Sequence, residues 1–328
     1  MDIELHCPLQ GSKVNIWSDF LAKAGLAADS DAEQTVLIWD AGELIATGSR
    51  TGNLLKCIAV DPARQGEGLL AKVLTTLRQE AFREGYQHLF LYTKPANGSL
   101  FSDLLFYPVA LTGDVLLMED RKDGIGCFVR NLSPQKHTGK IGAAVMNCDP
   151  FTLGHQYLIE TAARECDHLY VFVLSEDKGY FSATDRLEMV RRGTEHLSNI
   201  TVLPTGPYLI SATTFPTYFL KNRDQAEQIH CQLDVEIFVR YFVPAFTITT
   251  RYVGTEPLSE LTNQYNAVLK MQLPWQGIDV VEIPRLSIKD TPVSASAARK
   301  ALEDKDQQVL RSLVPHTTFT YLKDKHFI

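Results

Sequence analysis

The sequence lacks the features of a secreted, membrane-spanning or metal-centred protein. Its six cysteines are scattered, with no C-x-x-C pair, which argues against a zinc site and a disulfide framework and fits a reducing compartment. The first residues, MDIELHCPLQ, do not combine a basic region with an apolar core, so they do not resemble a secretory signal. The most apolar later stretch, IFVRYFVPAFTI, contains Arg240 and Pro244 and is too short to span a bilayer. We therefore expect a cytoplasmic protein with no membrane partner and no protein-held metal.

The sequence also has no excess of positive charge. Lys and Arg number 32 against 39 Asp and Glu, a net charge of −7, and no Lys/Arg block interrupts this balance. Nucleic acid is therefore not expected as a partner. The hydrophobic content of 45% is ordinary for a globular protein, and 328 residues exceed the usual size of one core. Two domains are the natural expectation.

A polar stretch with Pro and Gly, RNLSPQKHTGK at 130–140, is the best candidate for a linker. It predicts a first domain over 1–132 and a second over 133–328. Within the first domain, β-branched and apolar residues alternate over 34–60, a glycine loop follows, and helical spacing begins at Leu69. This order predicts an α+β domain.

The second domain alternates strictly between apolar strands and amphipathic helices. The predicted strands are 140–146, 168–175, 200–204, 248–254 and 278–284. The predicted helices are 154–167, 182–197, 234–246, 263–273 and 294–306. Such alternation predicts an α/β fold of the Rossmann-like type, a parallel sheet covered on both faces. Ligands of these sheets bind at the carboxyl ends of the strands.

The segment NCDPFTLGH, residues 147–155, follows the first of those strands and precedes its helix. A helix N-terminus has free backbone N–H groups and suits phosphate. Gly154 allows close approach to the backbone, His155 offers a hydrogen bond or a positive charge, and Thr152 adds a hydroxyl. The same residues also fit a simple cap, in which Thr152 closes the helix and His155 is solvated.

A second polar helix start, TPVSASAARKAL, lies near the C-terminus. Ser294 and Ser296 place two hydroxyls at the start of the helix and Arg299 follows in its first turns. Hydroxyls, free N–H groups and a guanidinium together form a good polyphosphate clamp. A serine-capped and solvated helix is the alternative interpretation.

Together the two segments resemble the nucleotidyltransferase superfamily, with its (T/H)-x-G-H motif and its C-terminal I-S-x-[ST]-x-x-[RK] motif. They occur here as 152–155 and 293–299, in the right order. The wider context, which includes VLSEDKGYFSATDRLEMVRRGT, FVPAFTITTRYVGTEP and NQYN, resembles the [citrate (pro-3S)-lyase] ligase family over residues 140–325.

That resemblance implies an ATP-dependent acid–thiol ligase. Such an enzyme adenylates acetate and acetylates the thiol of the CoA-like prosthetic group on the acyl carrier subunit of citrate lyase, releasing AMP and diphosphate. ATP and Mg²⁺ are the implied cofactors, with Mg²⁺ on the phosphates. The implied catalytic residues are His155, Arg299 and Lys178. The implied ATP-binding residues are Asn147, Phe151, Thr152, Gly154, His155, Arg186, Gly254, Ser294, Ser296 and Arg299.

Two of those cations also follow from position alone. Lys178 and Arg186 lie just after the second predicted strand of the domain, on its ligand edge. Arg251 and Glu256, which flank a later strand end, are weaker candidates. Each charged residue taken alone also fits an ordinary solvated side chain, since exposed Lys and Arg are the norm.

In the first domain, VDPARQGEGLLAKVL resembles the acyl-CoA loop of the GNAT acetyltransferases, with Leu70 as a departure from its pattern. Backbone N–H groups of such a loop hold a pyrophosphate. The residues assigned to a CoA-like group are Val60, Gln65, Gly66, Glu67 and Gly68.

The GNAT resemblance weakens further along the chain, in NGSLFSDLLFYPV. The tyrosine expected there as general acid is replaced by Phe101, and the expected glycine by Leu105. Phenylalanine cannot protonate a thiolate, so this domain is expected to bind the prosthetic group rather than to catalyse. Two alternatives remain: a small-molecule adenylyltransferase of the phosphopantetheine or mononucleotide type, or a GNAT protein acetyltransferase with a nucleotide-sensing domain.

Overall fold

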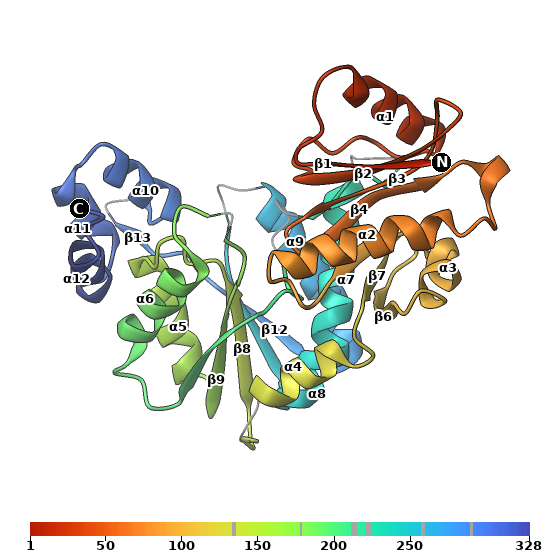
Figure 1. The fold of residues 1–328 in the computed structure, drawn as a ribbon. Helices are drawn as coiled ribbons and strands as arrows, with labels where there is room; N and C mark the ends of the chain where they lie inside the picture. The colour runs from red at the N-terminus through yellow and green to blue at the C-terminus, as the bar shows by residue number, and fades with distance from the viewer. Residues whose placement is uncertain (133–135, 178, 211–214, 221–224, 257–259, 289–290) are drawn as a thin grey trace. The chain divides into compact units, whose positions relative to one another are not determined.

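The computed structural model describes residues 1–132, 136–177, 179–210, 215–220, 225–256, 260–288 and 291–328. The chain forms two compact units (Figure 1). The first consists of Met1–Gly124 and Pro216–Ile229, and the second of Ile125–Phe215 and His230–Ile328. The first unit thus includes a segment that the sequence had assigned to the second domain. The N-terminal part of the first unit ends at Gly124, so helix α4, Gly124–Leu132, belongs almost entirely to the second unit, although the predicted boundary after Leu132 placed it in the first domain.

The first unit is built on a seven-stranded sheet with the order β1-β2-β3-β4-β5-β7-β6. Its strands are β1 Asp2–His6, β2 Gln34–Asp40, β3 Glu43–Thr51, β4 Leu54–Val60, β5 Phe90–Thr93, β6 Tyr107–Leu111 and β7 Leu116–Glu119. Its helices are α1 Ser12–Lys23, α2 Leu69–Arg83 and α3 Gly98–Ser102, with short 3₁₀ turns at Pro62–Arg64 and Pro95–Asn97. The predicted α+β architecture is confirmed.

Helix α2 lies on this sheet through its apolar stripe, because Val73 and Leu77 are completely buried. The packing leaves no room for a side chain at Gly48 on β3, where an added Cβ would lie 2.4 Å from Val73 Cγ1. The neighbouring strands β4 and β5 are parallel but paired over only two positions, Leu54–Phe90 and Leu55–Leu91. Their carboxyl-terminal parts are therefore not joined by ladder hydrogen bonds.

The second unit contains the predicted parallel sheet, with the order β10-β9-β8-β11-β12. Its strands are β8 Ile141–Met146, β9 His168–Val173, β10 Ile200–Pro204, β11 Thr250–Gly254 and β12 Asp279–Ile283. All four neighbouring pairs are parallel. The predicted and observed bounds of each strand agree within a few residues. Strands covered on both faces need a continuous apolar sequence, and this run marks them in the chain.

Helices cover both faces of this sheet (Figure 1). The helices of the unit, besides α4, are α5 Leu153–Arg164, α6 Ala183–Thr194, α7 Ala226–Ile237, α8 Val243–Phe246, α9 Glu260–Gln272, α10 Ala295–Glu303, α11 Gln307–Leu313 and α12 His316–Asp324. Of these, α7 begins in the segment assigned to the first unit. Leu169, Val171 and Val173 of β9 pack into the core formed with α5, α6 and α10–α12. On the opposite face, Tyr170 and Phe172 contact Phe246 edge-to-face, at ring-centroid distances of 4.8 and 5.2 Å.

The helix predicted over 234–246 is longer than its sequence pattern indicated. It starts at Ala226 as α7, continues through a π-helical turn at Phe238–Phe242, and ends as α8. A short hairpin, β13 Ser287–Ile288 with β14 Thr291–Pro292, precedes α10, and a 3₁₀ turn at Leu273–Gln276 follows α9. Among the described residues, no helix is both long and apolar enough to cross a membrane.

Candidate nucleotide-binding site

Helix α5 begins at the carboxyl end of the central strand β8, and Thr152 is its N-cap. The Thr152 hydroxyl accepts a hydrogen bond from the backbone N–H of His155 at 3.4 Å. In return, Nδ1 of the His155 ring accepts from the backbone N–H of Thr152 at 3.1 Å. This is a reciprocal capping box in which histidine occupies the usual place of Glu or Gln. The capping and phosphate-binding interpretations of this motif are therefore compatible.

The capping box fixes the chemistry of the His155 ring. Because Nδ1 accepts a backbone hydrogen bond, the neutral ring carries its proton on Nε2, which is left as a donor. Burial, with a smaller contribution from the charge of Arg285, lowers the pKa of His155 to about 4. The ring is densely surrounded by protein although part of the residue reaches the surface. Of the two roles expected from the sequence, hydrogen-bond donor or positive charge, only the donor is available near neutral pH.

The lowered pKa of His155 predicts a measurable loss of stability in acid. The unfolded chain binds this proton more tightly than the folded one, so the contribution is fully present above pH 6.5 and is lost as the pH falls toward 4. It amounts to at most about 3 kcal/mol. We expect urea unfolding at pH 7 and pH 4.5 to show a smaller decrease for His155→Asn than for the unsubstituted protein. Equal decreases would contradict the buried, neutral ring.

Asp149 joins the loops that follow the two neighbouring strands β8 and β9. Its carboxylate accepts hydrogen bonds from the backbone N–H groups of Tyr180 and Phe181, both at 2.9 Å. At Gly179 an added Cβ would lie 2.9 Å from Asp149 Oδ2, so the close approach requires glycine. The segment after β9 is thereby held against the start of α5.

The C-terminal motif lies against the same place. Ser294 is the N-cap of α10, and its hydroxyl accepts from the backbone N–H of Ala297 at 3.1 Å. Arg299 donates to the backbone carbonyl of Asp149, and its Nη1 lies 3.6 Å from an Asp149 carboxylate oxygen. Its Nη2 donates to the Ser296 hydroxyl at 3.2 Å. The guanidinium is thus fixed beside the first motif.

Gly154 shows directly that the two motifs meet. A Cβ added there would lie 3.4 Å from the backbone oxygen of Val293. The N-termini of α5 and α10, far apart in the sequence, therefore lie side by side at one edge of the sheet. Each brings backbone N–H groups without intrahelical partners and the positive end of a helix dipole. This arrangement suits a polyphosphate.

Arg285 is a further cation of the site that the sequence analysis did not identify. It follows β12, and its Nε donates to the Val293 carbonyl at 3.1 Å. Its Nη1 forms an ion pair with Glu256, and its backbone N–H donates to the Thr255 hydroxyl at 2.9 Å. Glu256, a weak candidate in the sequence, thus pairs with Arg285. Arg285 could have been identified as a candidate from its position just after the last predicted strand of the parallel sheet.

Arg186 adopts a role different from that of a free cation. Its side chain is completely buried, and its guanidinium donates to the carbonyl of Asn147 at 2.9 Å, to the Asn147 side chain, and to the carbonyls of Phe181 and Glu176. In this arrangement Arg186 ties the loops after β8 and β9 together. A contact with ATP remains a prediction for Arg186 and Asn147. Lys178 lies outside the described residues.

The remaining predicted residues lie around this edge. Phe151 is completely buried in the core, with its ring centroid 6.0 Å from that of His155, so the side chain supports the histidine. Gly254 ends β11, and its carbonyl accepts from Asn266 Nδ2 at 2.8 Å. Arg251 lies inside the same strand, is 2% exposed, and has its guanidinium over the Phe238 ring at 4.7 Å, away from the strand ends.

The described residues contain no group of three or more His, Cys, Asp or Glu side chains that could hold a metal ion. The carboxylate of Asp149, close to both helix starts, already accepts two backbone N–H bonds and lies beside Arg299. A cation in this site would therefore be held mainly by substrate phosphates and water, as Mg²⁺ commonly is. The residues present are compatible with that mode.

In the first unit, the loop predicted to bind a CoA-like group turns through two glycines with positive φ, Gly66 at 88° and Gly68 at 73°. Gly68 is the N-cap of α2, and nothing lies within 4 Å of a Cβ added at either glycine. Glu67 is paired with Arg64 at 2.7 Å, so its carboxylate is engaged within the loop. The loop leads from Val60, at the end of β4, through Gln65 into α2.

A small cavity of about 110 Å³ lies where β4 and β5 separate. Phe101 lines it, and so do Tyr218 and Phe219, which come from the later half of the chain. The Tyr218 hydroxyl donates to the carbonyl of Tyr92 at 2.9 Å, and its carbonyl accepts from the N–H of Ala27 at 2.8 Å. The sequence analysis did not predict that Tyr218 and Phe219 line this cavity, because no local sequence pattern shows that a segment will pack in a different unit from the residues on either side of it.

The second unit is thus an α/β domain with a parallel sheet, in which the two segments that resemble nucleotidyltransferase motifs meet at one sheet edge. Residues 141–322 match the family described as the citrate lyase ligase C-terminal domain. The chain belongs to the citrate lyase ligase family.

Two relatives support this assignment over nearly the whole chain. The [citrate [pro-3S]-lyase] ligase of Klebsiella pneumoniae is 42% identical over 92% of this chain and 90% of its own length. That of Escherichia coli (strain K12) is 36% identical over 94% of this chain and 89% of its own length. A solved acyl-CoA N-acyltransferase from Pseudomonas aeruginosa covers 37% of this chain and all of its own, at 15% identity and a TM-score of 0.31. That last likeness supports no functional statement.

Proposed function

We propose that the protein is an ATP-dependent acid–thiol ligase that acetylates the thiol of a CoA-like prosthetic group on the acyl carrier subunit of citrate lyase. The observation that carries the proposal is the contact between the two nucleotide motifs, seen in Gly154 against Val293 and in Arg299 on Asp149. Membership of the citrate lyase ligase family, at 42% identity to one relative, names the reaction. The six free cysteines fit a cytoplasmic location.

In the first step, a carboxylate oxygen of acetate attacks the α-phosphorus of ATP. The bond from that phosphorus to the bridging oxygen breaks, and diphosphate leaves. Acetate is already ionised at neutral pH, so this step needs no general base. It needs two anions brought together and the growing charge on diphosphate stabilised. Nε2 of His155, the N–H groups of α5 and α10, and Arg299 would supply those contacts.

In the second step, the thiol of the prosthetic group attacks the acetyl carbonyl of the adenylate. A thioester forms, AMP leaves with the former acetate oxygen, and the thiol proton is released. When present, Mg²⁺ would bind the phosphate oxygens of ATP and neutralise part of their charge. We assign no described side chain as a metal ligand.

The first unit would hold the prosthetic group. Its loop at 65–68 directs backbone N–H groups at the start of α2, which suits a pyrophosphate. The described residues of this unit offer Phe101 where an acid would be needed for acetyl transfer, so binding is its proposed role. The proposed ligase differs in this respect from the alternative, a GNAT acetyltransferase. That enzyme would take the acetyl group from acetyl-CoA and would need no ATP.

Isotope exchange tests the adenylation step. Purified protein with ATP and Mg²⁺ should exchange labelled diphosphate into ATP only when acetate is added, because acetyl-adenylate formation is reversible. Exchange that depends on a phosphate monoester, such as phosphopantetheine, would instead support the adenylyltransferase alternative. Exchange with neither addition would contradict both.

A backbone substitution tests the loop of the first unit. Gly66→Val should weaken binding of dephospho-CoA to the full-length protein roughly tenfold or more, because valine disfavours the positive φ found there. Calorimetric titration measures this affinity, and Gly113→Val, in an exposed turn without a positive φ, is the matched control. Acetate-dependent exchange should be unchanged in both. Equal affinity of the Gly66 variant would contradict the assignment.

A further inference from the structure

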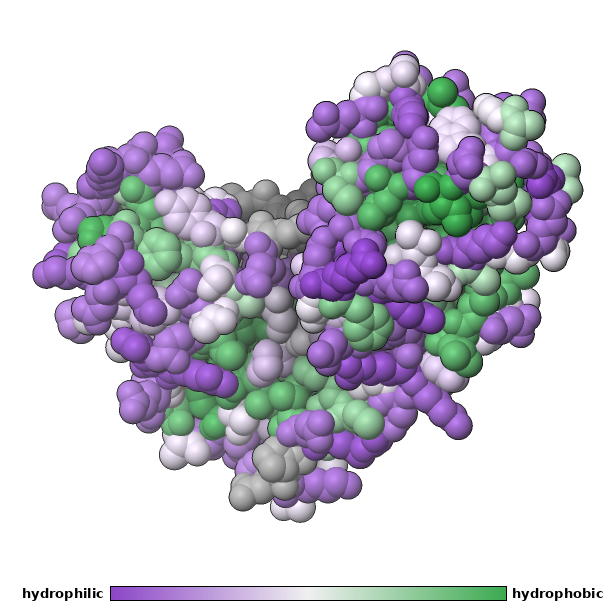
Figure 2. All heavy atoms as spheres, in the orientation of Figure 1, coloured by the Kyte–Doolittle hydropathy of each residue, from purple (hydrophilic) through white to green (hydrophobic). Residues whose placement is uncertain are grey.

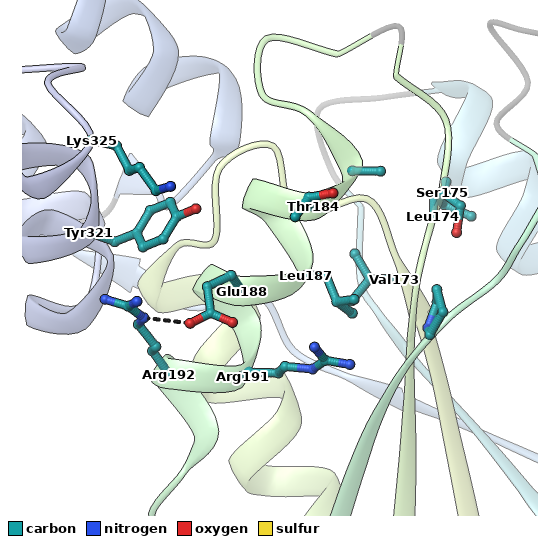
Figure 3. A pocket seen from close by; sticks show the side chains of 12 residues that line it. Val173, Leu174, Ser175, Thr184, Leu187, Glu188, Arg191, Arg192, Tyr321 and Lys325 are labelled. Carbon is teal, nitrogen blue, oxygen red and sulfur yellow. Dashed lines mark hydrogen bonds and ion pairs between the residues drawn. The ribbon is translucent and has the colours of Figure 1, made fainter. Parts of the chain in front are cut away.

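A groove of about 390 Å³ runs along the outer side of α6 in the second unit (Figure 3). We call it the α6 groove and define it by Leu187, Arg191, Arg192, Pro204, Tyr321 and Lys325. The end of β9 and the edge strand β10 form one wall, and α12 with the residues after it forms the other. None of the residues assigned to the nucleotide site lines it.

The groove is cationic in a chain whose net charge is −7. Its lining contains three cations and one carboxylate, Glu188. Arg191 is exposed and, within the described part of the chain, has no carboxylate within ion-pair distance. Arg192 is bound to Glu188 at 2.8 Å. Lys325 interacts electrostatically with Asp185 but forms no ion pair within the described residues, so Arg191 and Lys325 remain to attract an anionic partner.

Aromatic stacking holds one side of the groove in place. The guanidinium of Arg192 and the ammonium of Lys325 lie 4.9 and 5.9 Å from the centre of the Tyr321 ring. The Tyr321 hydroxyl donates to Asp185 at 2.6 Å, which fixes the ring. Preorganised cations lose less conformational entropy when a partner binds.

The floor of the groove is apolar. Leu187 and Pro204 are half-buried, and Val173 beneath them is buried. Figure 3 shows Leu187 and Val173 on the side of α6 that faces the strands, with Arg191 near them, and Arg192, Tyr321 and Lys325 on the other side of the helix. An apolar floor rimmed by exposed cations is the arrangement of a protein contact site, with a desolvated centre and a charged rim.

The groove lies next to the nucleotide site because both use α6. Arg186 is buried on the inner side of the helix, where it binds Asn147, and Arg191 is exposed on the groove. Five residues along a helix correspond to about 7.5 Å. A protein bound in the groove would therefore stand beside the edge of the sheet where acetate would be activated.

We propose that the α6 groove docks an acidic surface of the carrier subunit that bears the prosthetic thiol, with an apolar side chain on Leu187 and carboxylates on Arg191 and Lys325. This inference rests on the proposed function. Electrostatic complementarity of this kind raises the rate of association and orients the partner. Here it would deliver the thiol arm to the side of the unit that holds the adenylate.

The test uses the full-length protein and the double variant Arg191→Glu/Lys325→Glu, which leaves the Arg192–Glu188 pair intact. We expect the KM for the purified carrier subunit to rise tenfold or more at low salt, and the difference to shrink as salt increases. Acetate-dependent diphosphate exchange, and acetylation of free dephospho-CoA, should stay unchanged. Arg164→Glu, an exposed arginine in the last turn of α5, is the matched control and should change nothing.

Several outcomes would overturn the docking proposal. An unchanged KM of the double variant for the carrier subunit would contradict it. An equal loss of activity toward free dephospho-CoA would also contradict it, because the groove would then bind the prosthetic group itself. If the double variant loses exchange, the milder Arg191→Ala and Lys325→Ala variants decide by the same comparison. If the unsubstituted protein shows no exchange, the proposed function fails, and calorimetric binding of the carrier subunit to both proteins still decides the docking.

Discussion

Replacing His155 by alanine should lower acetate-dependent diphosphate exchange by roughly ten- to a thousandfold, the usual effect of losing one transition-state hydrogen bond to a developing charge. The ring offers one donor, Nε2, since Nδ1 is engaged by the backbone of Thr152. Its pKa of about 4 keeps it neutral, so no titration of His155 should appear in the exchange rate between pH 6 and 8.

His155→Ala also removes one half of the capping box of α5, which costs about 1 kcal/mol of stability. His155→Gln is the informative companion, because an amide can cap the helix as Gln does in other capping boxes. We expect the glutamine variant to unfold close to the unsubstituted protein and still to lose most of the exchange. Full exchange in both variants would contradict the role of His155.

Replacing Arg299 by alanine should have an effect of similar size, roughly ten- to a thousandfold on exchange. Its guanidinium is the cation fixed between the two motifs, on the Asp149 carbonyl and the Ser296 hydroxyl. Losing it removes both a phosphate partner and a link between α10 and the loop after β8. Arg299→Lys should recover part of the rate, since lysine keeps the charge without the planar fork.

The KM for ATP separates the two effects of Arg299→Ala. A phosphate contact predicts a higher KM for ATP or a lower rate, with a nearly unchanged KM for acetate. Arg311→Ala, whose guanidinium stacks on Phe319 at 3.8 Å on the surface of the same unit, is the control. If Arg299→Ala lost no more exchange than this control, Arg299 would be only a structural residue.

Local chemistry made the two helix starts predictable. Thr152 and Ser294 are capping residues in the loops that follow two strands of the parallel sheet, β8 and β12, although the short β13–β14 hairpin lies between β12 and Ser294. Parallel strands end at one edge of their sheet. The sequence could therefore place both motifs at the same edge of the sheet. It could not show that Gly154 and Val293 would touch, because that contact depends on how α5 and α10 pack on the finished sheet.

The roles of the arginines could not be predicted in the same way. Arg186 was expected to contact ATP from its position, which remains a prediction, and the structure adds that its guanidinium donates to backbone carbonyls of three different loop residues. Arg285 was missed, although it approaches His155 closely enough to lower the pKa of the ring. A side chain with five donors can bind a ligand or its own backbone, and only the three-dimensional neighbours decide between them.

The segment 216–229 shows a different limit. Tyr218 and Phe219 line the cavity of the first unit, although the chain before Pro216 and after Ile229 belongs to the second unit. Periodicity describes elements and their faces, and carries no information on which sheet a connecting segment will join. The wall that this segment adds beside Phe101 was therefore invisible in the sequence.

A crystal structure of the protein with a nonhydrolysable ATP analogue tests the central claim most directly. We expect the triphosphate between the N-termini of α5 and α10, with Nε2 of His155 and the guanidinium of Arg299 within hydrogen-bond distance of its oxygens. Phosphates bound elsewhere, with Gly154 and Ser294 facing only solvent, would contradict the assignment of the nucleotide site.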